Sequence, residues 1–258
     1  MSAGRLIRKI PAEGMAPGAN PPTRETHSRP IHTLDGTVVI VLAKLRPRHW
    51  YWGWNRVALG RWLSPDAPGL KFIKTLGSGR NGGFGLVPSP SHQGIFCVFD
   101  SAQSAQAFVD DAPLLHRYRN ASDEWFTALL RPTSVRGSWD GISIAPSAPA
   151  SGMIATLTRA SIRPLAALSF WRHAPAAQRS LLAAPGCALA VGLGEAPLLR
   201  QATFSLWDSA AAMDAYARTG AHLDAIRAAW KHQFFSESMF VRFVPLQLQG
   251  QWKGRRFA

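Results

Sequence analysis

The chain carries an internal repeat, and this repeat limits its fold to architectures built from two similar halves. Residues 43–77 align without gaps on residues 160–194, with nine identities in 35 positions. A fixed offset of 117 residues over so long a block is typical of a duplicated structural unit rather than of chance similarity. We therefore expect residues at equivalent positions of the two copies to occupy equivalent places in the fold.

Two later blocks extend the duplication toward the end of the chain. The dipeptide Asp-Ser occurs at 100–101 and at 208–209, so the offset has fallen to 108 and nine residues are extra in the first copy. The pattern G-x-W-x-G then occurs at 137–141 and at 250–254. The three blocks occur in the same order in both copies and together predict a tandem duplication.

Each copy shows the element order strand, helix, strand, strand, helix, strand. In the first copy, short β-branched runs alternate with segments of helical spacing, and the Asp-Ser pair supplies an N-cap for the second helix. The fold class that this pattern predicts is α+β, with two ferredoxin-like βαββαβ units whose sheets close into a barrel. The predicted elements of the first copy are strands in 37–45, 70–76, 94–100 and 125–130 and helices in 50–63 and 101–119.

The same reading divides the chain into four parts. Residues 1–34 are rich in Pro, Gly and Arg and lack periodicity, which predicts a disordered basic extension. Residues 35–142 form the first ferredoxin-like repeat, 143–150 a linker, and 151–258 the second repeat.

The charge of the chain predicts an anionic partner. Its 29 Lys and Arg residues outnumber 15 Asp and Glu residues, which gives a formal net charge of +14. An anionic bilayer, an acidic protein or the propionates of a haem would each match this charge. Nucleic acid would match it too, but no strand of the RNA-binding type occurs, so we expect no nucleic-acid partner.

Cysteine usage and hydropathy predict a cytoplasmic protein. The two cysteines, Cys97 and Cys187, lie in separate apolar runs without the spacing of a zinc site or a disulfide framework. No run is long enough to span a bilayer, and the first residues lack the apolar segment of a signal peptide. The location expected is the cytoplasm, with peripheral contact at an intracytoplasmic membrane.

A G-x-G-x-x-G pattern at Gly77, Gly79 and Gly82 raises the question of dinucleotide binding. That motif binds pyrophosphate where it joins a strand to a helix, because the amides at the helix N-terminus point at the anion. Here a strand-like segment follows, and the nine extra residues fall in the same place. We predict a hairpin loop, with Arg80 and Phe84 available to cover a pocket.

Several long stretches of the chain, taken together, resemble one enzyme family. The stretches "GLKFIKTLGSGRNGGFGLVPSPSHQGIFCVFDS", "LTRASIRPLAALSFWRHAPAAQRSL" and "GQW" are similar in sequence and order to spheroidene monooxygenases, over roughly residues 36–254. The resemblance implies the dimeric α/β-barrel fold and an enzyme with haem b that uses O2 and reduced ferredoxin. The implied reaction oxidises C-2 of an acyclic carotenoid, converting spheroidene into spheroidenone through a 2-hydroxylated intermediate.

The resemblance also implies a haem ligand on the second helix of the second copy. His222 is our first choice for the axial ligand, because it borders a sheet-facing stripe marked by Tyr216 and Ile226 and has small neighbours beside it. Tyr216 and Ile226 are then expected to contact the cofactor. The alternative is that His222 binds no iron and is only a packed or solvent-edge histidine of the helix.

Other side chains remain open as ligands or acids. His232 is the second choice, as a distal acid or as the ligand itself, and the alternative is a cation that stabilises the helix C-terminus. His173 is the third, because the first copy has Arg56 at that position. Thiolate ligation by Cys97 or Cys187 is disfavoured, since the glycine-framed cysteine loop of other haem monooxygenases is absent.

The tryptophan-rich segment "HWYWGWNRVALGRW", residues 49–62, predicts a basic aromatic helix. Such a helix suits a membrane interface or a carotenoid channel, and core packing is the alternative. The basic charge would also attract an acidic ferredoxin. Two other functions stay open: another haem-barrel enzyme of the aldoxime dehydratase kind, and a barrel that binds haem or an apolar ligand without turnover.

Overall fold

The first copy folds as the repeat pattern predicts, with helices on one side of its strands. The computed structural model describes residues 30–60, 62–148, 151–196 and 198–258, except for the side chains of residues 173, 221, 222, 225, 226 and 230. The elements of the first copy are β2 (Thr37–Leu45), α1 (Trp50–Ala58), β3 (Leu70–Gly79), β4 (Pro88–Phe99), α2 (Ala102–Asp111), α3 (Pro113–Ala121) and β5 (Ser122–Gly137).

The second copy repeats this order. Two short strands, β1 (His32–Leu34) and β6 (Ile142–Ile144), pair in parallel as a separate small sheet. The elements of the second copy are β7 (Ile154–Ile162), α4 (Ala167–Leu182), β8 (Cys187–Ala196), β9 (Arg200–Trp207), α5 (Ala210–Ala217), α6 (Gly220–Lys231), β10 (Phe235–Trp252) and β11 (Arg255–Phe257).

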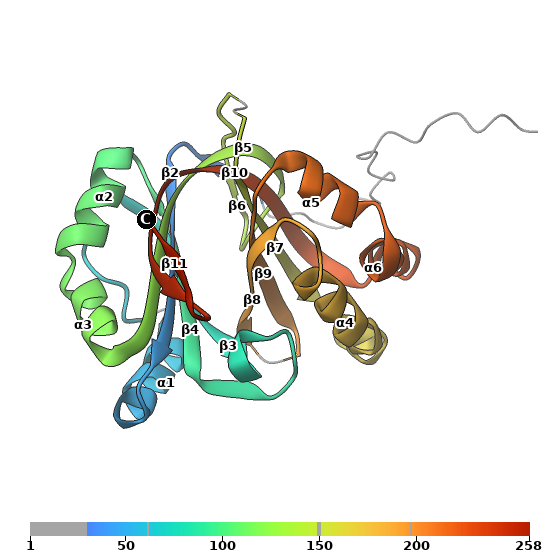
Figure 1. Ribbon diagram of the computed structural model, residues 1–258, viewed down its shortest axis with the longest axis horizontal. Helices are drawn as coiled ribbons and strands as arrows, with labels where there is room; N and C mark the ends of the chain where they lie inside the picture. The colour runs from blue at the N-terminus through green and yellow to red at the C-terminus, as the bar shows by residue number, and fades with distance from the viewer. Residues whose placement is uncertain (1–29, 61, 149–150, 197) are drawn as a thin grey trace, which may run out of the picture. The chain divides into compact units, whose positions relative to one another are not determined.

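Eight of the strands close into an antiparallel barrel. Their order is β10-β5-β2-β4-β3-β8-β9-β7, and β7 pairs with β10 to close the ring. Helices α1, α2 and α3 lie on one side of the barrel and α4, α5 and α6 on the other (Figure 1). The predicted fold class, two ferredoxin-like units forming an α+β barrel, is confirmed.

The two junctions between the copies obey the symmetry of the repeat. At one junction Gly77 of β3 lies opposite Gly194 of β8, and these two glycines are equivalent in the repeat. At the other, β5 and β10 pair so that Gly137 lies opposite Met239 while Gly250 lies opposite Phe126. Gly250 and Met239 lie 113 residues after Gly137 and Phe126, so the two pairs exchange places when one copy is replaced by the other. A pseudo-twofold axis therefore relates the copies.

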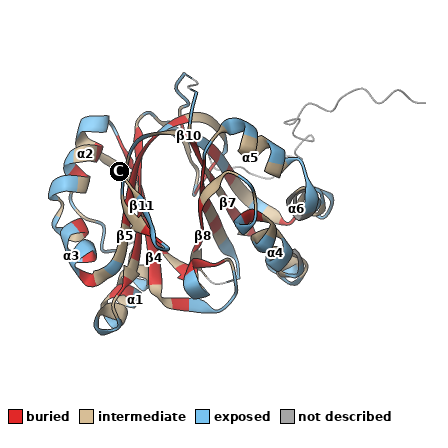
Figure 2. Cartoon of the chain, in the orientation of Figure 1, coloured by how far each residue is buried: buried red, intermediate tan, exposed pale blue. Residues whose placement is uncertain are grey.

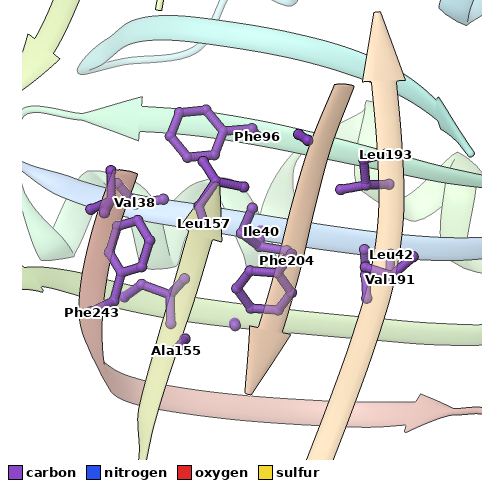
Figure 3. Packing of buried hydrophobic residues seen from close by; sticks show 14 of the residues in the cluster. Val38, Ile40, Leu42, Phe96, Ala155, Leu157, Val191, Leu193, Phe204 and Phe243 are labelled. Atoms are coloured by element: carbon purple, nitrogen blue, oxygen red, sulfur yellow. The ribbon is translucent and has the colours of Figure 1, made fainter. Parts of the chain in front are cut away.

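The interior of the barrel is filled by apolar side chains from both copies. Alternate residues of each strand point inward, as the two-residue period of a strand requires. Figure 3 shows Ile40, Leu157 and Phe204 meeting in this interior. The buried cluster includes Val38, Ile40, Leu42, Phe96, Phe126, Leu157, Val191, Leu193, Phe204 and Phe243. The barrel is thus a packed core rather than a channel.

Single helices were predicted after each Asp-Ser pair, and the structure has two in each place. In the first copy Pro113 breaks the helix, because proline lacks an amide hydrogen and forces Ala112 into an extended conformation. In the second copy Gly220 breaks it with a φ of +57°. The predicted caps are confirmed: Ser101 accepts from the amide of Ser104, and Ser209 from that of Ala212.

The glycine-rich segment is a hairpin, as predicted. β3 leads through a short 3-10 turn, Arg80–Gly82, into β4, with no α-helix for a dinucleotide phosphate. In this turn Asn81 and Gly82 have positive φ angles of 57° and 72°. The predicted hairpin loop is therefore confirmed, and the strand-to-helix junction that dinucleotide binding requires is not found at this segment.

The predicted boundaries meet the structure only in part. Of the extension predicted over 1–34, residues 1–29 lie outside the described residues, whereas His32–Leu34 form β1 beside β6. Of the linker predicted over 143–150, residues 143 and 144 belong to β6. Among the described helices, none has the length and apolar character needed to cross a membrane.

Candidate active site

The face of the barrel that the first-copy helices cover is closed by apolar packing. Val39 and Val41 of β2 lie opposite Cys97 and Ile95 of β4, and all four are at most 1% exposed. Their side chains pack beneath α2 and α3, where Tyr118 is also fully buried. This face therefore leaves no room for a ligand between sheet and helices.

The equivalent face of the second copy is polar and incompletely covered. The residues at the four corresponding positions are Thr156 and Thr158 of β7, opposite Ser205 and Thr203 of β9. The three threonines are half-buried, whereas their first-copy equivalents are fully buried. Because threonine and valine have nearly the same volume, the exposure of Thr156 and Thr158 reflects looser cover rather than smaller side chains. The threonines are therefore less tightly covered than the equivalent residues of the first copy.

Strand β10 adds an aromatic ring to this face. Phe240 pairs in register with Thr158 and is 37% exposed, while Thr127, its equivalent in the first copy, is 2% exposed. Next to it Arg242 pairs with Thr156 and forms an ion pair with Asp214 of α5 at 2.6 Å. We call the six residues Thr156, Thr158, Thr203, Ser205, Phe240 and Arg242 the second-copy face.

The first-copy hairpin reaches across to one end of this side of the barrel. The amide of Phe84 donates to Gln178 Oε1 of α4 at 3.0 Å, and the ring packs into the small cluster beneath α4 and α5. A Cβ at Gly192 would lie 2.4 Å from the Gly83 carbonyl oxygen and 2.8 Å from the Phe84 ring. The nine extra residues thus cover one end of the second-copy side, and Gly192 makes their close approach possible.

Figure 2 shows the contrast in burial between the two sets of helices. In the first copy, α2 and α3 bury Phe108, Leu115 and Tyr118 against the sheet. In the second copy α6 packs on α4 and α5, and among the side chains that the structure describes the buried cluster on that side is smaller. Its fully buried members are Ile154, Leu181, Ala190, Trp207 and Met213.

The predicted haem ligand lies on the helix set that covers the second-copy face. His222 and Ile226 are in α6, but both side chains lie outside the described residues. Tyr216 lies on α5, so the stripe predicted on one helix is divided between two. Its ring packs on Trp207 of β9 at 5.2 Å, and its hydroxyl donates to the Ala177 carbonyl at 3.4 Å. Tyr216 therefore faces the sheet, as predicted.

The two other histidine candidates belong to the same helix set, His173 within α4 and His232 directly after α6. His232 follows α6, is exposed, and stacks on Phe234 at a ring separation of 5.7 Å. His173 is in α4, and its side chain lies outside the described residues. The roles predicted for both remain predictions.

The cysteines are poorly suited to thiolate ligation. Cys97 is buried between the sheet and the first-copy helices, and this burial raises the pKa of its thiol. Burial raises the pKa of Cys187 to about 11, although a hydrogen bond with the Leu189 backbone acts in the opposite direction. Thiolates form readily only where the pKa is lowered. Among the described residues no three His, Cys, Asp or Glu side chains gather as a metal site, and a haem needs only axial ligands.

The tryptophan-rich helix α1 divides its aromatic residues between two environments. Trp52 packs on Tyr118 at 4.7 Å, and the indole N–H of Trp50 donates to the Leu45 carbonyl at 3.0 Å. Tyr51 and Trp54 instead point to solvent. Core packing is therefore confirmed for Trp50 and Trp52, whereas the membrane interface or carotenoid channel predicted for this helix stays a prediction.

A buried charged cluster closes one mouth of the barrel, and the sequence analysis did not anticipate it. Arg159 is 1% exposed and forms ion pairs with Glu237, Glu195 and Asp140. Lys74 joins it by binding Glu195 at 3.1 Å and also Asp140. Burial alone would raise the pKa of Asp140 and of Glu237, but hydrogen bonds and nearby cations outweigh burial and lower both. The cluster is therefore held in its ionised form.

A buried histidine, His92 of β4, lies at the other mouth of the barrel. His92 is 6% exposed, its Nδ1 lies within 3.0 Å of the hydroxyls of Ser89 and Ser91, and its ring meets Trp252 edge to face. Burial, followed by the charges of Lys44 and Lys253, lowers the pKa of His92 to about 4. The ring is therefore neutral at physiological pH.

This histidine predicts a loss of stability in mild acid. The unfolded chain has a histidine pKa near 6.5, so below that pH the unfolded state binds more protons than the folded state. We expect the free energy of unfolding to fall by up to about 3 kcal/mol between pH 6.5 and pH 4, at 1.36 kcal/mol per pKa unit. Urea titrations of the wild type and His92→Asn at both pH values measure the effect. Equal slopes with pH for the two proteins would contradict it.

The arrangement defines a class of protein before any relative is considered. Two fused ferredoxin-like units form a closed barrel, and the residues of the second-copy face are less buried than their equivalents in the first copy. This is the dimeric α/β-barrel class with both halves in one chain. Aldoxime dehydratase OxdRE, solved with butyraldoxime, shares the fold at a TM-score of 0.51 and 9% identity, over 81% of this chain and 79% of that one.

Sequence comparison identifies the family. The chain is 52% identical to spheroidene monooxygenase of Rubrivivax gelatinosus over 88% of its own length and 90% of that protein. It is 34% identical to spheroidene monooxygenase of Rhodobacter capsulatus, over 79% and 87% of the two chains. The chain therefore belongs to the spheroidene monooxygenase family and is a monooxygenase. No family model matches it.

Proposed function

We propose that this monooxygenase oxidises C-2 of the acyclic carotenoid spheroidene, twice, to give spheroidenone in carotenoid biosynthesis. The cofactor proposed is haem b, the oxidant O2, and the electron donor reduced ferredoxin. The names of the relatives support the carotenoid substrate. The observation that supports a bound cofactor is the half-buried second-copy face, where the first copy has a sealed one.

The overall reaction sets what the site must provide. Each step inserts one oxygen atom of O2 into a C–H bond and reduces the other atom to water, which consumes two electrons and two protons. The second hydroxylation at the same carbon gives a geminal diol, and loss of water leaves the ketone. Activation of O2 is the chemistry that haem supplies when bound, because amino-acid side chains do not provide it.

The residues of the second copy fit a flat, largely apolar cofactor and substrate. We propose that His222 of α6 holds the iron, with Tyr216 and Ile226 beside the macrocycle. The exposed ring of Phe240 provides an apolar surface, and the half-buried hydroxyls of Thr156 and Thr158 accept or donate hydrogen bonds there. His232 is proposed to hold or deliver a proton at its imidazole as a distal acid.

Phe84 has a separate part in the proposal. It packs with Trp207 and Tyr216 in the same cluster, so the first-copy hairpin keeps water from that end of the site. Exclusion of water favours oxidation of the substrate over unproductive loss of reduced oxygen. The remaining end, toward α6, would admit the carotenoid chain.

A matched pair of substitutions tests the space above the second-copy face. Thr158→Phe and Val41→Phe change equivalent positions of the two copies by adding an aromatic ring. In the sealed first copy, overpacking is expected to cost about 3 kcal/mol of unfolding free energy. In the second copy the ring enters open space, so stability changes by less than about 1 kcal/mol, while haem binding weakens at least tenfold. Urea denaturation and haem titration measure the two effects, and equal destabilisation in both copies would contradict the assignment.

Two alternative functions remain to be separated by experiment. An aldoxime dehydration would consume neither O2 nor electrons, and the barrel shared with aldoxime dehydratase supports the fold alone. A barrel that only binds haem or an apolar ligand would leave spheroidene unchanged when O2 and reduced ferredoxin are present. Product analysis with each of these components left out in turn distinguishes all three functions. We further propose that the enzyme works in the cytoplasm in contact with the membrane that stores its substrate.

A further inference from the structure

One region of the surface gathers apolar side chains from both copies around the pseudo-twofold axis. At the β3–β8 junction, Trp54 of α1, Leu86 of the β3–β4 hairpin and Leu198 of the β8–β9 hairpin line a common cavity of about 80 Å³. The indole N–H of Trp171 donates to the Leu198 carbonyl at 3.0 Å, which joins α4 to the same region. Four elements that are distant in sequence therefore meet here.

The apolar side chains of this region are unusually exposed. Tyr51 and Leu168, which are equivalent in the repeat, are 82% and 71% exposed and lie one helical turn before Trp54 and Trp171. Large exposed apolar patches in soluble chains mark interaction sites. We call this set the axial surface; it comprises Tyr51, Trp54, Leu86, Val87, Leu168, Trp171, Leu198 and Leu199.

The charge around the axial surface has one sign. Residues 46–99 contain a single acidic residue, Asp66, and residues 141–207 contain a single one, Glu195. The carboxylate of Glu195 is engaged by Lys74, Arg159 and the indole of Trp139. The acidic side chains of these segments therefore do little to offset their arginines.

Exposed arginines adjoin the apolar residues directly. The amide of Arg80 donates to the carbonyl of Val87, and Arg172 and Arg200 follow Trp171 and Leu199 in the chain. All three arginine side chains are exposed. Exposed aromatic and leucine side chains with exposed arginines next to them in the chain suit the boundary of a membrane. Indole and phenol rings are favoured there, and anionic headgroups attract cations.

We propose that the axial surface docks the protein on an anionic lipid bilayer. The charge favours a bilayer over a second copy of this chain, because two surfaces rich in arginine would repel. The docking explains how a water-insoluble carotenoid is reached, and only this explanation rests on the proposed function. It also places the contact on both copies, whereas the sequence analysis considered only the helix around residues 49–62.

Vesicle binding tests the proposal without haem or carotenoid. The full chain is sedimented with sucrose-loaded vesicles of phosphatidylcholine alone or with 30% phosphatidylglycerol, a composition chosen on the order of that of anionic membranes. We expect binding to the anionic vesicles only. The double variant Tyr51→Ser/Leu168→Ser should bind at least tenfold more weakly, and Arg200→Gln roughly fivefold more weakly, from about 1 kcal/mol per basic residue near the surface.

Matched controls lie at the opposite junction of the barrel, between β5 and β10. Leu246→Ser and Arg131→Gln remove an exposed apolar and an exposed basic side chain there, and both should bind like the wild type. Equal loss in the controls, absence of binding to anionic vesicles, or equal binding to neutral ones would overturn the proposal. So would a stable dimer in analytical ultracentrifugation that Tyr51→Ser/Leu168→Ser dissociates. None of these results depends on turnover, so failure here is distinct from failure of the proposed reaction.

Discussion

His222→Ala is expected to lose haem binding at least about 100-fold, since even outer partners of a metal ligand contribute about 10- to 100-fold. The proposed ligand lies in α6, which belongs to the helix set covering the second-copy face. The interior of the barrel is packed mainly by strand residues, so we expect the substitution to leave the barrel folded. Haem titration followed at the Soret band measures the loss, and far-UV circular dichroism establishes that the variant is folded.

Two other histidine variants make the test specific. His116→Ala changes an exposed histidine of α3 in the first copy and should bind haem normally. His232→Ala should keep the haem and lower turnover, because His232 is proposed as an acid rather than as the ligand. If His232→Ala loses the haem while His222→Ala retains it, the ligand is His232 and our assignment is wrong.

Arg159→Leu is expected to destabilise the fold by about 3 kcal/mol or more, the cost typical of breaking a buried ion pair. The guanidinium is fully buried and forms ion pairs with Glu237, Glu195 and Asp140, of which Glu195 and Asp140 are also bound by Lys74. The leucine itself fits this side of the barrel, since Leu42 fills the equivalent position of the first copy. The loss therefore measures the carboxylates left without their partner rather than a failure of packing.

A double-mutant cycle separates the two contributions. Arg159→Leu/Glu237→Gln removes the charge that the single substitution leaves unpaired, so we expect it to recover part of the lost stability. Urea denaturation at pH 7 gives the four free energies of the cycle. Additive effects of the two substitutions would show that Arg159 and Glu237 do not interact, contrary to the structure.

Much of the fold could be predicted because the repeat gives the same order of strands and helices in two separate segments of the chain. The βαββαβ order, the hairpin at 77–83 and the Ser101 and Ser209 caps follow from local chemistry and were predicted from it. Pro113 and Gly220 are standard signals for the end of a helix. The helical spacing of the sequence continues past both residues, so one long helix was predicted in each copy and the two breaks were missed. The site was harder to predict, because its residues come from β7, β9 and β10, which are separated in sequence and adjacent only in the barrel.

A signal for the second-copy face was nevertheless present in the sequence. At equivalent positions of the repeat, Val39 and Val41 correspond to Thr156 and Thr158, a change from apolar to polar on one face of a strand. Identities between the copies locate the shared fold, whereas such differences locate what each copy does separately. The charged cluster had a weaker signal, the arginine of an otherwise uncharged strand, because its partners Glu195 and Glu237 lie far along the chain.

An absorption spectrum of the purified wild-type chain, taken oxidised and then reduced under carbon monoxide with a pyridine haemochrome assay, tests the central claim most directly. The account predicts a Soret band, one haem per chain, and a reduced carbon monoxide spectrum of the histidine-ligated type rather than the thiolate type. A chain that binds no haem even after reconstitution would contradict it. The second-copy face would then hold a different ligand.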